Sequence, residues 1–146
     1  MTTAAVIAPA VCFLSSCSSD TVYFSYQTVD DERWDKADNV SFEIVPSRQS
    51  GKCNGFVVLR MNDKYPYKNL SVNVETAMKG MPCRHRRVDF DVTRNYQGIR
   101  HNDYIMPLDT FTLSEGDTLR IRIAHDMKRH VLRGITNVGV KIEKIR

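Results

Sequence analysis

The 146-residue sequence lacks the short motifs that mark several common kinds of enzyme site. It contains no Gly-x-Ser-x-Gly elbow for an activated serine and no His-Glu-x-x-His pair for zinc. A glycine-rich loop of the kind that cradles phosphate is missing as well. We therefore predict a protein that is not an enzyme.

Two further groups of residues could in principle serve catalysis or metal binding. Asp89 and Asp91 would lie roughly 6.5–7 Å apart on one face of a strand, a spacing that a glycosidase can use. Alternating acids are, however, the ordinary solvated face of a sheet, which is the interpretation we favour. His125 and His130 are five residues apart, but Lys128 between them would repel a cation. We expect a solvated loop there, with no metal and no cofactor.

The sequence also has no apolar run of the ~20 residues that a membrane-spanning helix needs. Its run over residues 4–14 has 11 residues, which suits the ~7–15 of a signal-peptide core. The run leads into Leu-Ser-Ser-Cys, ending at Cys17, and polar residues follow, a pattern typical of bacterial lipoprotein signals. The three residues before the run include no Lys or Arg, unlike most secretory signals. The alternative is a buried N-terminal strand or helix with an incidental cysteine.

The lipoprotein pattern predicts three parts of the chain. Residues 1–16 would be the signal peptide, residues 17–38 the lipidated N-terminus and tether, and residues 39–146 the folded domain. Two or more acyl chains on Cys17 would give stable anchoring, since one chain alone binds a membrane only marginally. We expect a cell-envelope protein on the outer membrane, facing the periplasm.

The charge of the chain is modest, with a formal net charge of +4. Its basic residues are interleaved with acids, whereas a nucleic-acid-binding protein needs a clustered basic footprint. We predict no nucleic-acid partner. A basic surface directed at an anionic membrane or an acidic partner fits this charge better.

Cysteine is scarce, at four residues. Cys12 would leave with the signal peptide and Cys17 would carry lipid, which leaves Cys53 and Cys83. In an oxidising compartment these two could form a disulfide. They could equally be two unrelated thiols, because cysteine is often buried without pairing. Zinc is less favoured, since neither lies in a Cys-x-x-Cys pair.

Alternation of apolar and polar residues dominates the folded part. This period of two indicates strands with one buried and one exposed face, and it occurs at residues 40–44, 70–75, 88–92, 119–123 and 138–142. Further strands are expected at residues 22–26, 56–61 and 111–113. Residues 95–107 and 129–136 are expected to be long connections, the second with one helical turn. Seven or eight short strands and little helix predict an all-β antiparallel β-sandwich, jelly-roll-like or Ig-like.

Three aromatic residues are candidates for contact with a partner or ligand. Trp34 is the single tryptophan and could either cap the edge of the core or form an exposed platform. Tyr65 and Tyr67 flank a proline at a turn, where they could pack at the sheet edge or stack on a sugar. A carbohydrate-binding module tethered to the envelope is therefore the alternative function.

One stretch resembles the GldH gliding motility lipoproteins of the Bacteroidota. Residues 63–74 have an Asp, then Tyr-Pro-Tyr two residues on, then Asn-Leu and a strand, as in that family. Residues 127–142 agree through a Met-basic pair, Leu-x-Gly-Ile and Val-Gly before the last strand. Val22-Tyr23 after the lipoprotein cysteine, and Trp34 ahead of Val-Ser-Phe, extend the resemblance. Residues 76–87 depart from the family pattern.

The resemblance implies an envelope lipoprotein associated with gliding motility and the type IX secretion apparatus. The family offers no enzymatic activity to assign to residues, and the protein is expected to act through contacts with envelope proteins.

Overall fold

The structure, a computed structural model, describes residues 20–46, 50–92 and 101–146. This part of the chain forms one short 3-10 helix, η2 (Asp30–Glu32), and ten strands. The strands are β1 (Thr21–Thr28), β2 (Arg33–Asp35), β3 (Val40–Ile44), β4 (Gly51–Asn62), β5 (Asn69–Met78), β6 (Arg84–Asp91), β7 (His101–Leu113), β8 (Leu119–His125), β9 (Val131–Arg133) and β10 (Ile135–Lys144). Within these ranges no helix is long and apolar enough to cross a bilayer. The predicted signal peptide and Cys17 lie outside the described residues.

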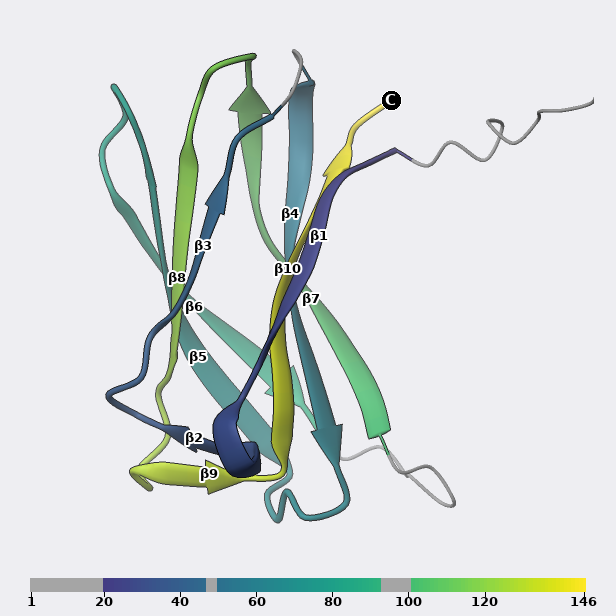
Figure 1. Cartoon of the computed structure of the whole chain (residues 1–146), viewed down its shortest axis with the longest axis vertical. Coiled ribbons are helices and arrows are strands. Elements are labelled where there is room, and N and C mark those ends of the chain that lie inside the picture. Colours follow the sequence, from purple (N-terminus) through teal and green to yellow (C-terminus); the bar gives the residue numbers. More distant parts are fainter. Residues whose placement is uncertain (1–19, 47–49, 93–100) are drawn as a thin grey trace, which may run out of the picture.

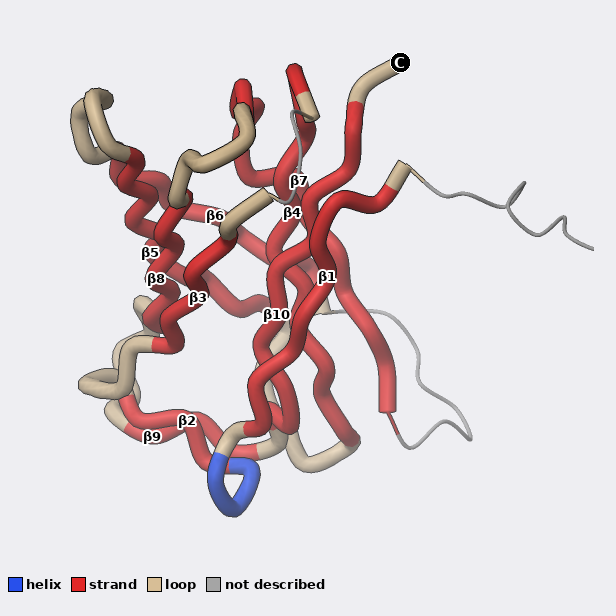
Figure 2. The backbone as a smooth tube through the Cα atoms, turned by 45° about the horizontal axis from the view of Figure 1, so that its top comes forward, coloured by secondary structure: helices blue, strands red, loops and turns tan. Residues whose placement is uncertain are grey.

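Eight strands form two four-stranded antiparallel sheets that face each other (Figures 1 and 2). Sheet A has the order β1-β10-β4-β7, and sheet C has the order β3-β8-β5-β6. Strands β2 and β9 form a two-stranded sheet B, which lies across one end of the sandwich (Figure 1). The predicted all-β sandwich is confirmed, and the strand orders are those of a jelly roll, a double-sheet fold of eight strands.

The alternating sequence pattern builds the core between sheets A and C. In β8, Leu119, Ile121 and Ile123 are buried, while Arg120 and Arg122 between them are exposed. Successive side chains of a strand point to opposite faces, so one face of each sheet is apolar and turns inward. The inward residues of both sheets form one hydrophobic core.

Strand β7 begins earlier than the sequence indicates. Its first part, residues 101–107, was expected to belong to a long loop, and it contains Pro107. β7 is an edge strand of sheet A, where proline is tolerated because one side of the strand makes no ladder hydrogen bonds. Opposite Pro107 the register shifts between Gly55 and Phe56, and the ladder continues to Leu113.

The N-terminal boundary of the sandwich also differs from the prediction. β1 pairs with β10 over Thr21–Thr28, and β2 pairs with β9. Residues 21–35 are therefore part of the fold, where residues 17–38 were expected to form a tether. Strand β9 occupies part of the connection predicted at residues 129–136. Strands of three residues carry too little alternation to be recognised in a sequence.

We call the end at which β1 begins the leading end, and the opposite end, covered by sheet B, the closed end (Figure 1). Two of the family-like segments meet at the closed end. Asn62 donates its backbone N–H to the Gly134 carbonyl at 2.9 Å, and Gly134 donates to the Glu32 carbonyl at 2.9 Å. A side chain at Gly134 would lie 2.3 Å from the backbone nitrogen of Tyr65, and its φ is +86°, so only glycine fits.

Candidate interaction surface on sheet A

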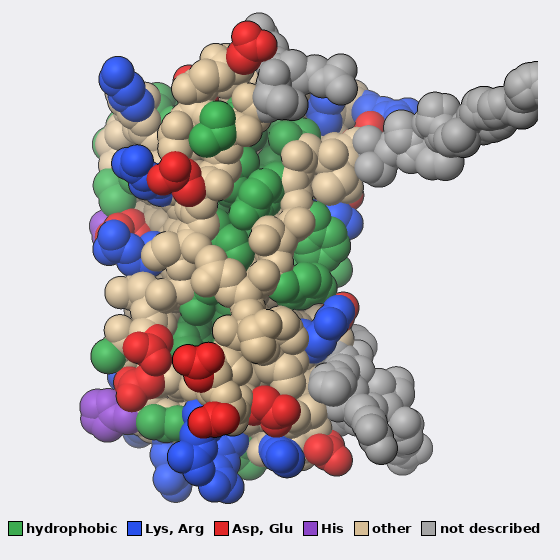
Figure 3. Space-filling model, viewed as in Figure 1, with side chains coloured by type: hydrophobic (Ala, Val, Ile, Leu, Met, Phe, Trp, Pro, Cys, Tyr) green, Lys and Arg blue, Asp and Glu red, His purple; other side chains and the backbone are tan. Residues whose placement is uncertain are grey.

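The outward side of sheet A carries aromatic and aliphatic residues where a solvated sheet face would be polar. The strand register aligns two rows across β1, β10, β4 and β7. The rows are Phe24–Lys141–Phe56–Pro107 and Tyr26–Gly139–Val58–Ile105. Phe24 and Ile105 are 46% and 50% exposed. Figure 3 shows hydrophobic side chains gathered beside β1. We call these two rows the aromatic face.

A second, small apolar layer lies on this face, separate from the main core. Val58 is completely buried, yet it is not part of the core cluster between the sheets, because it points outward. Its neighbour Gly139 has no side chain, and the ring of Tyr26 fills the space, since a Cβ at Gly139 would lie 2.9 Å from that ring. Aromatic cover of a glycine in a neighbouring strand is a known stabilising arrangement in sheets.

A pair of opposite charges borders the aromatic face. The Arg60 Nε lies 2.8 Å from Asp103 Oδ1, and its guanidinium carbon lies 4.8 Å from the centre of the Tyr26 ring. The Tyr26 hydroxyl donates to Asp103 at 3.4 Å. Burial and the nearby Asp103 charge raise the pKa of Tyr26, so its hydroxyl stays protonated and remains a donor. On the other row, Lys141 Nζ lies 5.4 Å from the Phe24 ring centre.

The aromatic face has the composition of a protein-binding surface. Aromatic residues and arginine are enriched in the centres of protein interfaces, and both occur here over an apolar base. The Phe24 and Tyr26 rings are tilted by 44° and are 5.1 Å apart, so they offer no flat platform for a sugar ring. Sequence reasoning missed this face because only the strand register shows that the two rows align.

The aromatic residues singled out from the sequence lie elsewhere, at the closed end. Trp34 is 1% exposed, donates its indole N–H to the Asp38 carbonyl at 3.0 Å, and meets His125 edge-on. Tyr65 is 6% exposed, and its hydroxyl donates to the Asn69 carbonyl. Tyr67 is partly exposed and meets Tyr65 at 78°, edge to face. Trp34 and Tyr65 are buried, so neither offers an exposed ring on which a sugar could stack.

The disulfide considered from the sequence is not formed. Cys53 and Cys83 are both free thiols. Cys53 lies on β4 in sheet A and faces the core, whereas Cys83 precedes β6 in sheet C and is exposed. Burial raises the pKa of Cys53, which keeps it a protonated, unreactive thiol.

The histidine segment is only in part the solvated loop that was expected: residues 128–130 are exposed in a connection, but His125 is not. His125 ends β8, is almost completely buried, and has its Nε2 3.0 Å from the His130 carbonyl. Its Nδ1 accepts the backbone N–H of Met127 at 3.3 Å. Burial lowers the pKa of His125, so the ring is neutral and stabilises the closed end.

The acidic pair is solvated, as expected for a sheet face. Asp89 accepts hydrogen bonds from the Ser71 hydroxyl at 2.6 Å and from Arg87 at 3.1 Å. These bonds, led by Ser71, lower the pKa of Asp89, which therefore stays ionised and is unsuited to act as an acid.

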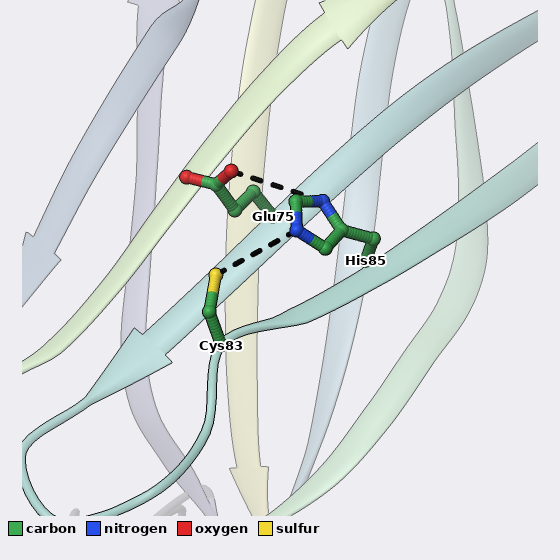
Figure 4. A group of neighbouring side chains, drawn as sticks. All are labelled: Glu75, Cys83 and His85. Carbon is green, nitrogen blue, oxygen red and sulfur yellow. Dashed lines mark hydrogen bonds and ion pairs between the residues drawn. The ribbon is translucent and has the colours of Figure 1, made fainter.

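Sheet C brings together one group of metal-ligand types, Glu75, Cys83 and His85 (Figure 4). Such side chains are typical zinc ligands. The two ring nitrogens of His85, however, face different partners: Nδ1 lies 3.7 Å from Glu75 and Nε2 lies 3.9 Å from Cys83. One ligand atom of each residue lies within 4.8 Å of the other two, but a single ion could bind only one of the two ring nitrogens. Arg122, 3.5 Å from the other Glu75 oxygen, adds a competing cation.

The structure thus defines the class of the protein as a jelly-roll domain with an exposed aromatic sheet face. Comparison with known proteins then identifies the family: the GldH lipoprotein profile matches residues 21–142, and the chain belongs to this family. A relative from Christiangramia forsetii, described as a gliding motility lipoprotein GldH homolog, is 24% identical over 148 residues. The match covers 92% of this chain and 90% of the relative. The resemblance seen in the sequence motifs is confirmed, and the protein is a gliding-related lipoprotein.

Two solved structures have distant similarity. An Eiger TNF from S. frugiperda has a TM-score of 0.39 at 11% identity, over 71% of this chain and 64% of that one. A family GH115 4-O-methyl-α-glucuronidase with specificity for decorated arabinogalactans has a TM-score of 0.45 at 10% identity. That match covers 97% of this chain and 18% of the glucuronidase.

Proposed function

We propose that this lipoprotein is a non-enzymatic component of the envelope machinery of gliding motility and type IX secretion. It is anchored through acyl chains on Cys17, on the outer membrane with the domain in the periplasm. It binds a protein partner through the aromatic face. Family membership supports the gliding association, and the lipoprotein pattern around Cys17 supports the anchor.

The observation that carries the binding role is the apolar layer on the outside of sheet A. Exposed single apolar residues are normal, but contiguous ones over a buried Val58 are characteristic of interaction sites. The partner that fits is a protein with a largely apolar surface, because the exposed side chains Phe24 and Ile105 are apolar and the Phe24 and Tyr26 rings are not coplanar. Arg60 and Asp103 at its border would fix the orientation of the partner.

Site-specific photo-crosslinking in native envelope tests this function. A benzophenone amino acid replacing Phe24 is expected to form one protein adduct of defined mass. The matched control replaces Ser41, which is exposed on the outward side of sheet C. The adduct should disappear when Ile105→Asp is added on the aromatic face and persist when Arg122→Asp is added on sheet C. The same adduct from the Ser41 position, or an adduct insensitive to Ile105→Asp, would contradict the proposal.

A further inference from the structure

We propose that the leading end of the sandwich rests directly on the membrane surface, with Val45, Met81 and Ile145 inserted among the lipid headgroups. The inference depends on the proposed lipidation of Cys17. It adds the surface that contacts lipid and the orientation of the domain.

The length of the chain between the lipid and the domain limits the distance of the domain from the bilayer. Asp20, the first described residue, is three peptide units from Cys17. At no more than ~3.6 Å per unit, Cys17 lies within about 11 Å of Asp20. The closed end is much farther away, since the twelve residues of β4 span about 40 Å between the two ends.

Asp20 is itself held firmly at the leading end. Its carbonyl accepts the backbone N–H of Lys144 at 2.8 Å, and its carboxylate pairs with Arg146 at 2.9 Å. Ile145 in turn donates to the Lys52 carbonyl at 2.9 Å. The attachment point is therefore part of the folded domain, and the short linker begins at a fixed position.

Exposed apolar residues gather at the same end. The antiparallel order brings the end of β3, the β5–β6 turn and the end of β10 together with the start of β1 (Figure 1). Each of these three segments carries an exposed large apolar side chain: Val45, Met81 and Ile145, which are 38% to 58% exposed. At the closed end Val131 is the one comparable side chain among the described residues. Apolar tips in separate loops suit shallow insertion into a headgroup layer.

A hollow lies beside Met81. It lies between the β5–β6 turn and the β7–β8 turn, and its walls include Met78, Met81, Phe111 and Leu119. Lys79, Arg84 and Asp117 belong to the same lining. An apolar hollow with an ammonium group suits lipid, because the amine can reach a phosphate while the walls contact acyl carbons.

The charges at the leading end allow this contact. Three of its acids are paired with arginines: Asp20 with Arg146, Glu43 with Arg120 and Asp109 with Arg84. Glu115 and Asp117 in the β7–β8 turn are further acids at this end, and Lys52, Lys79 and Lys144 offset their charge. The aromatic face runs along the strands, away from this end, and stays open to a protein partner.

Depth-dependent fluorescence quenching tests the orientation. The full-length acylated protein is reconstituted into phosphatidylethanolamine–phosphatidylglycerol vesicles, with Cys83→Ser removing the exposed thiol. An environment-sensitive label is attached to Val45→Cys, Met81→Cys or Ile145→Cys in separate samples. Controls are Val131→Cys at the closed end and Phe24→Cys on the aromatic face, both exposed. Spin-labelled lipids should quench each of the first three labels several-fold more than either control.

The outcomes separate the two proposals. Strongest quenching at Phe24, or equal quenching everywhere, would overturn the upright orientation while leaving the anchor intact. Mass spectrometry of the N-terminal peptide reports acylation independently. An unmodified Cys17 would overturn the anchor and the orientation together.

Discussion

The two outward faces of the sandwich use the same antiparallel geometry for different chemistry. Sheet C carries ion pairs across its strands, including Glu43 with Arg120 and Glu75 with Arg122. Sheet A carries the aromatic face, in which Val58 is sealed from water although it points away from the core. Charged ladders keep a sheet face soluble and add little stability. The aromatic face contributes stability and leaves apolar surface available for binding.

The largest expected effect comes from placing a charge in the outer apolar layer. Val58→Asp would bury a carboxylate without a partner, and we expect the free energy of unfolding to fall by about 3 kcal/mol or more. The matched change on sheet C, Asn73→Asp, lies at an exposed position and should change it by less than about 0.5 kcal/mol. Urea denaturation measures both. If both variants changed the free energy of unfolding by similar amounts, the apolar layer around Val58 would not contribute to stability as a buried layer should.

An intermediate effect is expected from the two arginines that characterise the faces. Arg60 pairs with Asp103 and also covers the Tyr26 ring, so Arg60→Ala should cost about 1 kcal/mol. Arg120 has the exposed pair with Glu43, and Arg120→Ala should cost about 0.3 kcal/mol. In 1 M salt the Arg60 value should fall, because the exposed ion pair is screened, but it should stay above the Arg120 value, because the van der Waals packing on the Tyr26 ring remains. A larger loss for Arg120 would reverse the assignment of the stabilising face.

The smallest expected effect is the dependence of the free energy of unfolding on pH. We expect it to come from His125 at the closed end and not from either outward face. Burial lowers the pKa of His125 below its usual value of 6.5, so the unfolded chain binds this proton more readily than the folded one. The free energy of unfolding should therefore fall as the pH drops through and below about 6.5. His125→Gln should flatten this dependence between pH 7.5 and 5.5, whereas His85→Gln on sheet C should leave it unchanged. A flattening by His85→Gln instead would place the pH response on the charged face.

The sequence predicted the strands wherever alternation was strong, and β3 has the predicted bounds. It could not predict the aromatic face. Phe24 and Ile105 are 81 residues apart, and only the ladder through β10 and β4 places them on one surface. The Tyr-Pro-Tyr turn, in contrast, could be singled out from the sequence because its three residues are contiguous. The turn packs directly against Gly134, so its role in the structure is to hold the closed end together.

The junction of Glu32, Asn62 and Gly134 also affects when this protein can fold. Asn62 donates its side-chain amide to Glu32 at 2.7 Å, and Gly134 donates to the same residue's carbonyl, so three distant parts of the chain meet at one point. Folding slows when native contacts join segments far apart in sequence. The closed end cannot assemble until residue 134 is available to the rest of the chain. The last strands must therefore be present before the first are secured, and the unfinished chain is open to aggregation until then.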